Sequence, residues 1–231
     1  MREIVLDTET TGLSPNDGDR IVEIGCMELL NHVPTGKVYH QYINPERDMP
    51  AEAERVHGLS AEFLSGHPVF ADIADAFIEF VGESPLIIHN ASFDMGFINA
   101  ELARLGTEPL PKSRAIDTVS MARRKFPGAQ ASLDALCRRF GIDLSERDLH
   151  GALLDARLLA EVYLELLGGR QHGMDLAADA YESVQISENT PEVVDTTSGH
   201  RAPRAHAASE EENARHAVFL EKIKDPIWLR S

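Results

Sequence analysis

The sequence predicts an α/β domain built on a mixed five-stranded sheet flanked by helices, with a largely disordered C-terminal extension. Three observations carry this prediction. Strand-like apolar runs come first and in succession, helical spacing then alternates with short apolar runs, and the regular pattern ends near Gly168. Successive strands favour antiparallel pairing, whereas strands separated by helices favour parallel pairing, so one sheet should contain both.

The opening residues predict three strands. Residues 2–6 and Ile21–Leu30 are apolar runs rich in Ile, Val and Leu, and residues 38–43 alternate in the manner of a half-buried strand. A Pro-Thr-Gly turn at residues 34–36 predicts a hairpin between the second and third strands. An antiparallel meander is therefore expected at the start of the domain.

From Phe70 onward the apolar residues recur with the period of a helix. Gly106 and Gly141 are typical helix stops, and Ser132 is a typical N-cap. The predicted order is helix Phe70–Val81, strand Leu86–Ile88, helix 92–105, strand 115–118, a helix following Ser132, and helix 153–167.

Composition indicates a globular protein of 231 residues with a 43% hydrophobic fraction. It contains no apolar stretch approaching the roughly 20 residues that span a bilayer, and no signal-like core follows Met1, so a cytoplasmic location without membrane contact is expected. Cys26 and Cys137 lie within apolar patterns, where cysteine usually behaves as a small buried hydrophobe.

Four carboxylates and one histidine stand where regular elements begin or end. Asp7 and Glu9 end the first strand with a spacing of two, which directs both side chains to one face. Asp94 follows the candidate capping residues Asn90 and Ser92 in a first helical turn, and His150 precedes Asp155 by five residues. Each feature alone has an ordinary structural explanation, such as a solvated strand end or a helix-dipole contact.

Together these groups form the minimum set for two-metal phosphodiester hydrolysis, with cations about 3.5–4 Å apart. Oxygen ligands favour Mg²⁺ or Mn²⁺ over zinc. A net charge of −16 argues against independent tight binding of long DNA, yet bound cations would reverse the local field at such a site.

Three segments resemble the motifs of the DEDDh exonuclease family, namely DTETTG at 7–12, HNASFDMGF at 89–97 and HGALLDA at 150–156. The VHGLS segment at 56–60, with SLDALCRRFGID and LHGALLDARLLAEVYLELLGG, resembles the epsilon proofreading subunits of bacterial DNA polymerase III. The resemblance covers residues 2–169 and implies a ribonuclease H-like fold and a 3′→5′ exonuclease.

The resemblance also implies a role for each residue. Asp7, Glu9 and Asp155 would bind the cation that activates water, Asp7 and Asp94 would hold a second cation, and His150 would be the general base. The resemblance places Asp7, Glu9 and Asp155 next to the terminal nucleotide. Five further positions match residues that contact this nucleotide in the family, namely Thr10, Leu13, Val56, His57 and Phe93. Core packing remains the simpler explanation for Leu13, Val56 and Phe93, and a surface-loop role is equally open for His57. His89 and Asn90 are candidates for orienting Asp94 or the backbone beneath it.

Three other functions stay open at this stage. A DEDDh exoribonuclease similar to ribonuclease T or oligoribonuclease would use the same chemistry on RNA. A non-catalytic polymerase-stabilising subunit would need a broken carboxylate set, and a cation-binding regulatory module would leave His150 without a purpose.

The predicted domain comprises residues 1–169, and the composition of the chain changes after it. Residues 170–208 have few large apolar side chains and predict a flexible linker. Within it Gln171, Met174 and Leu176 resemble a sliding-clamp-binding peptide over residues 171–176. Residues 209–231 carry apolar anchors and, by the resemblance, would bind the polymerase III alpha subunit; they are Phe219, Leu220, Ile223, Ile227, Trp228 and Leu229.

Overall fold

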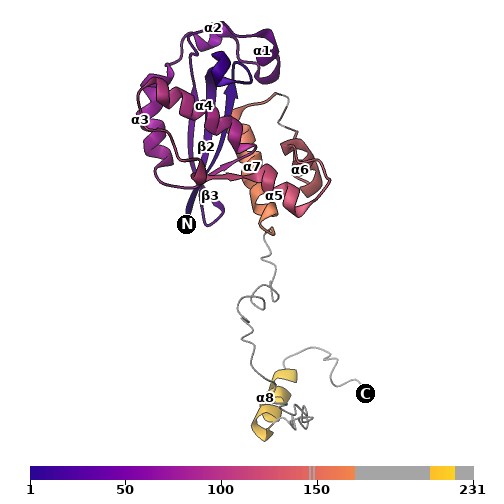
Figure 1. Cartoon of the computed structure of the whole chain (residues 1–231). Helices are drawn as coiled ribbons and strands as arrows, with labels where there is room; N and C mark the ends of the chain where they lie inside the picture. The colour runs from indigo at the N-terminus through magenta and orange to yellow at the C-terminus, as the bar shows by residue number, and fades with distance from the viewer. Residues whose placement is uncertain (146, 148, 170–208, 222–231) are drawn as a thin grey trace, which may run out of the picture. The chain divides into compact units, whose positions relative to one another are not determined.

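The computed structural model describes residues 1–145, 147, 149–169 and 209–221. The chain divides into two compact units, Met1–Leu176 and Ala177–Ser231, and each is described by itself. The first unit is a five-stranded sheet with helices on both faces, and the described part of the second is a single helix (Figure 1). The linker, the candidate clamp-binding peptide and residues 222–231 of the candidate alpha-binding segment lie outside the described residues.

The sheet has the strand order β3-β2-β1-β4-β5. Strands β1 (Arg2–Thr10), β2 (Ile21–Leu30) and β3 (Val33–Tyr42) form the antiparallel meander, and β4 (Leu86–Ile88) and β5 (Ala115–Asp117) continue parallel to β1. The predicted mixed sheet is confirmed, and the carboxyl ends of β1, β4 and β5 meet at one edge.

Helices cover the sheet and its carboxyl edge. Those of the first unit are α1 (Ala51–His57), α2 (Ala61–Leu64), α3 (Phe70–Val81), α4 (Ala91–Arg104), α5 (Thr118–Lys125), α6 (Leu133–Phe140) and α7 (Ala152–Leu166), with 3-10 turns η1 (Pro15–Asp17) and η2 (Lys112–Arg114). The second unit contains α8 (Glu210–Leu220), which begins with a capping box between Ser209 and Glu212. None of these described helices has the length and apolar character needed to cross a membrane.

Two details of the predicted meander are wrong. Strand β1 continues to Thr10 because β2 pairs with it along its whole length, so Asp7 and Glu9 lie within the strand. The hairpin turns at Asn31 and His32, whose positive φ angles of 51° and 66° make a tight two-residue loop. The Pro-Thr-Gly segment consequently lies inside β3.

Helices α1, α2 and α5 were not predicted, because they are short and carry few apolar residues at helical spacing. Helix α1 ends at Gly58, whose positive φ of 75° forms the C-cap. Asn90 precedes α4 in the left-handed region and makes no side-chain cap hydrogen bond, so the expected capping role is wrong.

Alternation along β1 connects two apolar cores on opposite faces of the sheet. Ile4 and Leu6 pack with α3 and α4, whereas Val5 packs with α6 and α7. The even-numbered residues of β1 therefore face α4, and the odd-numbered residues face α7. Cys26 and Cys137 are buried and free, as expected, one in each core.

Gly25 of β2 allows α7 to approach the sheet closely. A Cβ atom at this position would stand 2.3 Å from the backbone carbon of Ala152 and 2.3 Å from the backbone nitrogen of Leu153. These backbone atoms belong to the first turn of α7, which carries Asp155. The missing side chain of Gly25 thus fixes the depth at which the helix presents its carboxylate.

We expect Gly25→Ala to lower both thermal stability and metal-dependent activity, because a backbone clash cannot be relieved by rotating a side chain. Gly96→Ala is the control, since its added methyl meets nothing within 4 Å and replaces a glycine inside helix α4. Thermal unfolding of both variants measures the difference, and a Gly25→Ala variant as stable as Gly96→Ala would contradict this account.

Candidate active site

The first carboxylate pair comes from β1. Asp7 and Glu9 are odd-numbered residues of the strand and face α7, the helix that carries Asp155. Strand β4 pairs with β1 only at Ile4 and Val5, so the strand extends past its neighbour at the carboxyl edge. At Asp7 and Glu9, the edge of β1 that faces β4 is therefore not paired with another strand among the described residues.

Asp94 reaches the same edge from the opposite face of the sheet. Its Oδ1 accepts hydrogen bonds from the backbone nitrogen of Thr8 at 3.1 Å and from Thr8 Oγ1 at 2.8 Å. Thr8 is an even-numbered residue of β1 and faces α4, where Asp94 occupies the first turn. Thr8, which the sequence did not single out, is thus the residue that orients Asp94.

Asp155 is held by Arg147, another residue that the sequence did not single out. Arg147 Nε and Nη2 donate to the two carboxylate oxygens of Asp155 at 2.6 and 2.7 Å, and Arg147 Nη1 also contacts Asp134. This bidentate pair is nearly buried. A guanidinium in this position supplies the positive charge that the carboxylate requires in the metal-free protein.

His150 lies beside the same ion pair. Its Nδ1 is 3.2 Å from Asp155 Oδ2 and 2.9 Å from Arg147 Nη2. The tautomer with hydrogen on Nδ1 donates to Asp155 and leaves Nε2 as a free base, whereas a hydrogen bond from Arg147 requires a bare Nδ1. The backbone nitrogen of His150 donates to Val56 O at 3.1 Å, which ties this segment to α1.

Ligand atoms from Glu9, His150 and Asp155 lie within 4.8 Å of one another, the spacing of a cation site. Asp7 lines one cavity of about 330 Å³ together with His150 and Asp155. A predominantly oxygen donor set of this kind fits Mg²⁺ or Mn²⁺. Asp94 approaches from the other side of β1, so the five residues predicted from the sequence meet at one edge.

Burial raises the pKa values of three carboxyl groups, and charge repulsion adds to it at Asp7 and Glu9. The pKa of Asp7 is well above its ordinary value, first because of burial and then because of the charges of neighbouring carboxylates, of which Asp94 contributes most. Burial raises the pKa of Glu9 to about 8 and that of Asp94 to about 7. Burial also opposes ionisation of Asp155, but hydrogen bonds from Arg147 and His150 outweigh it and lower the pKa of that group.

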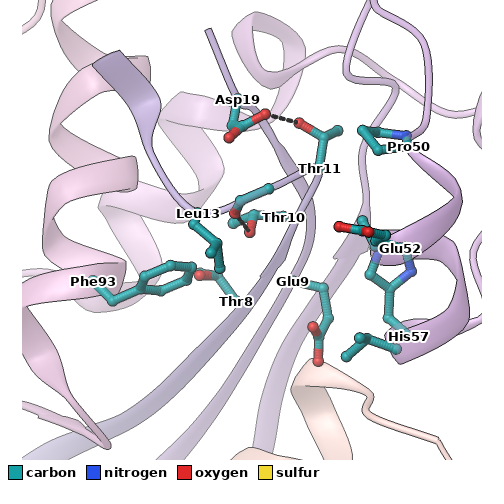
Figure 2. Close-up of a pocket in the computed structure, with 13 residues that line it drawn as sticks. Thr8, Glu9, Thr10, Thr11, Leu13, Asp19, Pro50, Glu52, His57 and Phe93 are labelled. Carbon is teal, nitrogen blue, oxygen red and sulfur yellow. Dashed lines mark hydrogen bonds between the residues drawn. The ribbon is translucent and has the colours of Figure 1, made fainter. Parts of the chain in front are cut away.

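A second cavity of about 550 Å³ adjoins the carboxylates (Figure 2). It is lined by Glu9, by the polar residues Thr10 and His57, and by the apolar residues Leu13, Val56 and Phe93. Leu13 is 86% exposed and Val56 is 47% exposed, so the core-packing explanation is wrong for both. Phe93 packs in part against the core but also borders the cavity.

His57 is buried at the end of α1, with 5% of its surface exposed, rather than in a surface loop. Its Nδ1 accepts a hydrogen bond from the backbone nitrogen of Leu59 at 3.0 Å, so a neutral ring carries its proton on Nε2. Burial lowers the pKa of His57 and favours this neutral form. Nε2, which carries that proton, is buried and has no hydrogen-bond partner of normal geometry among the described residues.

The loop after β1 is fixed by hydroxyl groups. Thr10 Oγ1 donates to Gly12 O at 2.6 Å, and Thr11 Oγ1 donates to Asp19 at 3.2 Å (Figure 2). These contacts hold Leu13 at the mouth of the cavity. Neither His89 nor Asn90 forms a hydrogen bond with the Asp94 carboxylate among the described residues, because His89 Nδ1 lies 2.9 Å from Thr118 Oγ1 and the Asn90 backbone nitrogen donates to Asp117. Asn90 O accepts a hydrogen bond from the Phe93 backbone nitrogen at 2.9 Å, within the turn that carries Asp94.

The sheet, the convergent carboxylates and the adjacent histidine define the class of protein as an exonuclease of the ribonuclease H-like fold. The family model described as "Exonuclease" matches residues 4–163. Among solved structures, the nuclease domain of 3′hExo, a DEDDh family member bound to rAMP, is 18% identical with a TM-score of 0.63, covering 72% of this chain and 91% of that one. Exonuclease X in complex with 5′ overhanging duplex DNA is 24% identical with a TM-score of 0.56, covering 71% and 90%.

Sequence relatives give a narrower assignment. DNA polymerase III subunit epsilon of Rickettsia felis is 51% identical, covering 96% of this chain and 97% of the relative. The subunits of the same name from Salmonella typhimurium and Escherichia coli K12 are 43% and 42% identical, and each comparison covers 96% of this chain and 93% of the relative. The chain belongs to the DNA polymerase III epsilon subunits, 3′→5′ exonucleases of the DEDDh family.

Asp94→Asn should stabilise the metal-free protein at alkaline pH. Because folding raises the pKa of Asp94 from 3.8 to about 7, folding is favoured while the group is protonated, and this advantage is lost as pH rises through about 7. An asparagine keeps the acceptor for Thr8 without the charge. In the presence of a chelator we expect the variant to have a higher Tm than the wild type at about pH 8 and nearly the same Tm at about pH 4. Each kcal/mol of added unfolding free energy should raise the Tm by about 2–4 °C.

Asp117→Asn is the control of opposite sign. Hydrogen bonds from Ser120 and the backbone outweigh burial and lower the pKa of Asp117, so its ionised form stabilises the fold above its ordinary pKa. This variant should lower the Tm at about pH 8. Equal effects of the two substitutions would contradict the cost that burial imposes on the Asp94 charge.

Proposed function

We propose that the chain removes nucleotides from the 3′ end of DNA by a two-cation mechanism and proofreads for the replicative polymerase. The observation that carries this proposal is the exposed apolar rim of the 550 Å³ cavity beside Glu9. Leu13 and Val56 offer exposed apolar surface to a base, and His57 would donate from Nε2 to a ligand that reaches that buried atom. We expect this cavity to hold a chain end rather than an internal nucleotide.

The carboxylates would hold Mg²⁺ or Mn²⁺ in the arrangement expected from the sequence. Glu9 and Asp155, with Asp7, are suited to the cation at the water, and Asp7 with Asp94 to the cation at the leaving oxygen. When bound, two such cations activate the attacking water and stabilise the departing 3′ oxygen. Cation binding would also offset the burial of these charges and the repulsion that helps to raise the pKa values of Asp7 and Glu9.

His150 would accept the proton of the attacking water at Nε2. This role needs hydrogen on Nδ1, donated to Asp155, and the 3.2 Å separation of these atoms permits that hydrogen bond. Arg147 competes for the same Nδ1 and the same carboxylate. Hydrogen on Nδ1 of His150, and therefore a free Nε2, requires that Arg147 does not donate to that Nδ1.

The segments that follow the nuclease domain would attach it to its partners. Residues 209–231 would bind the polymerase alpha subunit, and α8 contributes exposed Val218 and Phe219 to that surface. Residues 171–176 would bind the sliding clamp. Tethering would raise the local concentration of nuclease at the primer end and compensate for the acidic charge. These partners place the protein in the cytoplasm with the replication machinery.

Purified protein with Mg²⁺ should release 5′-mononucleotides from a 5′-end-labelled single strand of DNA, giving a ladder that shortens from the 3′ end. RNA of the same sequence should be degraded more slowly. A circular single strand should remain intact, because it offers no terminus to the cavity. Cleavage of the circle would contradict the exonuclease pocket, and faster hydrolysis of RNA would favour the exoribonuclease alternative.

Two variants test whether the nuclease activity comes from this active site or from a contaminating nuclease. Asp7→Ala should abolish the ladder, whereas His150→Ala should reduce kcat by about 10²–10⁴-fold and retain cation binding. Tm measured with and without Mg²⁺ reports whether each variant still folds and binds the cation. Full activity of Asp7→Ala would exclude the assigned site.

A further inference from the structure

Basic residues are concentrated on two neighbouring helices of this acidic chain. The whole protein carries 38 acidic and 22 basic residues. Helix α5 contains no acid and ends with three basic residues, and α6 contains one acid and ends with two. We call these five residues the α5–α6 basic surface: Arg123, Arg124, Lys125, Arg138 and Arg139.

Most of this charge is not used within the protein. Arg123 and Arg124 form no hydrogen bond or ion pair among the described residues. Arg138 lies 3.6 Å from Asp134 with 71% of its side chain exposed, and Arg139 rests on the Phe126 ring at 4.6 Å, which leaves its N–H groups free. Lys125 is different, because it donates to the last carbonyls of α7.

Adjoining hollows connect this surface to the carboxylates. The cavity that contains Asp7 and Asp155 shares His89 and Ser132 with a second hollow of about 660 Å³, which Arg123 lines. That hollow shares Ala129 and Gln130 with a third, of about 500 Å³, lined by Arg138 and Arg139. The three hollows therefore adjoin one another between the candidate active site and the ends of α5 and α6, and we call them together the groove.

The groove is built for phosphates more than for bases. Its neutral lining offers hydroxyl and amide donors from Ser92, Gln130 and Ser132. Besides the active-site carboxylates it contains Asp117, which already accepts hydrogen bonds from Ser120 and two backbone nitrogens, and Asp134, which already contacts Arg147 and Arg138. No Phe, Tyr or Trp side chain lines the two hollows at this end, and the nearby Phe126 ring is covered by Arg139, so the described lining offers no stacking platform.

We propose that the α5–α6 basic surface binds the sugar-phosphate backbone of the strand being degraded, on the 5′ side of its terminal nucleotide. This inference rests on the proposed function and extends it from the terminal nucleotide to the preceding ones. The α5–α6 basic surface provides local positive charge next to the active-site carboxylates of a protein that is acidic overall. Contacts to phosphates alone would make this binding independent of sequence.

The test compares Arg123→Gln/Arg138→Gln with the control Lys37→Gln/Lys112→Gln, which removes the same charge from β3 and η2. Lys37 is 74% exposed and Lys112 is also exposed, and neither lines the groove. Full-length proteins are titrated by fluorescence anisotropy, in Ca²⁺ at several salt concentrations, with an oligothymidylate long enough to cover the groove and with a thymidine dinucleotide. Hydrolysis of the p-nitrophenyl ester of thymidine 5′-monophosphate in Mg²⁺ reports the reaction centre alone.

Loss of two phosphate contacts should reduce the slope of log K against log salt by about 1.4, because each contact to a single strand contributes about 0.7. Affinity for the long strand should fall only in the arginine variant, while the dinucleotide and the ester should be unaffected. Equal slopes of log K against log salt in both variants would overturn the proposal. That result is the one expected if the α5–α6 basic surface binds an acidic protein instead of DNA. Failure of the wild type to hydrolyse ester and DNA alike would overturn the proposed function itself.

Discussion

Repulsion among four carboxylates at one edge of the sheet is the constraint on which the rest of the structure depends. Asp7, Glu9 and Asp94 have raised pKa values because the fold buries them close together. Burying such a cluster lowers the free energy of unfolding, and the burial of apolar side chains around it must offset that loss. Two apolar cores, one on each face of the sheet, supply that support and meet along β1. Arg147 relieves part of the repulsion at Asp155 and gives the metal-free site one positive charge.

Alternation along one central strand distributes the chemistry between the two faces. Odd-numbered residues of β1 present Asp7 and Glu9 to α7, while Thr8 between them reaches the other way and orients Asp94 on α4. Helix α7 can bring Asp155 close only because Gly25 has no side chain. A hydrogen bond from His150 to Val56 then connects the candidate base to the rim of the nucleotide cavity. Chemistry and substrate recognition thus share one backbone framework.

Local patterns were sufficient to predict the mixed sheet, the long helices and the five polar residues that meet at its edge. Each of those residues stands beside a regular element with a strong apolar pattern, so its position follows from short-range spacing. Thr8 and Arg147 could not be predicted, because their partners are 86 and 8 residues away in sequence and only packing brings them together. Leu13 and Val56 were ambiguous for another reason, since an apolar residue in sequence does not reveal whether a core or a ligand covers it. The resemblance to a family, rather than periodicity, directed attention to them.

The most direct test of the central claim is a count of bound Mn²⁺ by electron paramagnetic resonance, combined with the Tm, at about pH 8 with thymidine 5′-monophosphate. Ions that bind the folded protein stabilise it in proportion to the logarithm of their concentration. We predict two bound ions per chain and a rising Tm for the wild type, with both effects reduced in Asp7→Asn. Equal ion counts and equal Tm responses in the two proteins would contradict a fold organised around a cation-neutralised carboxylate cluster.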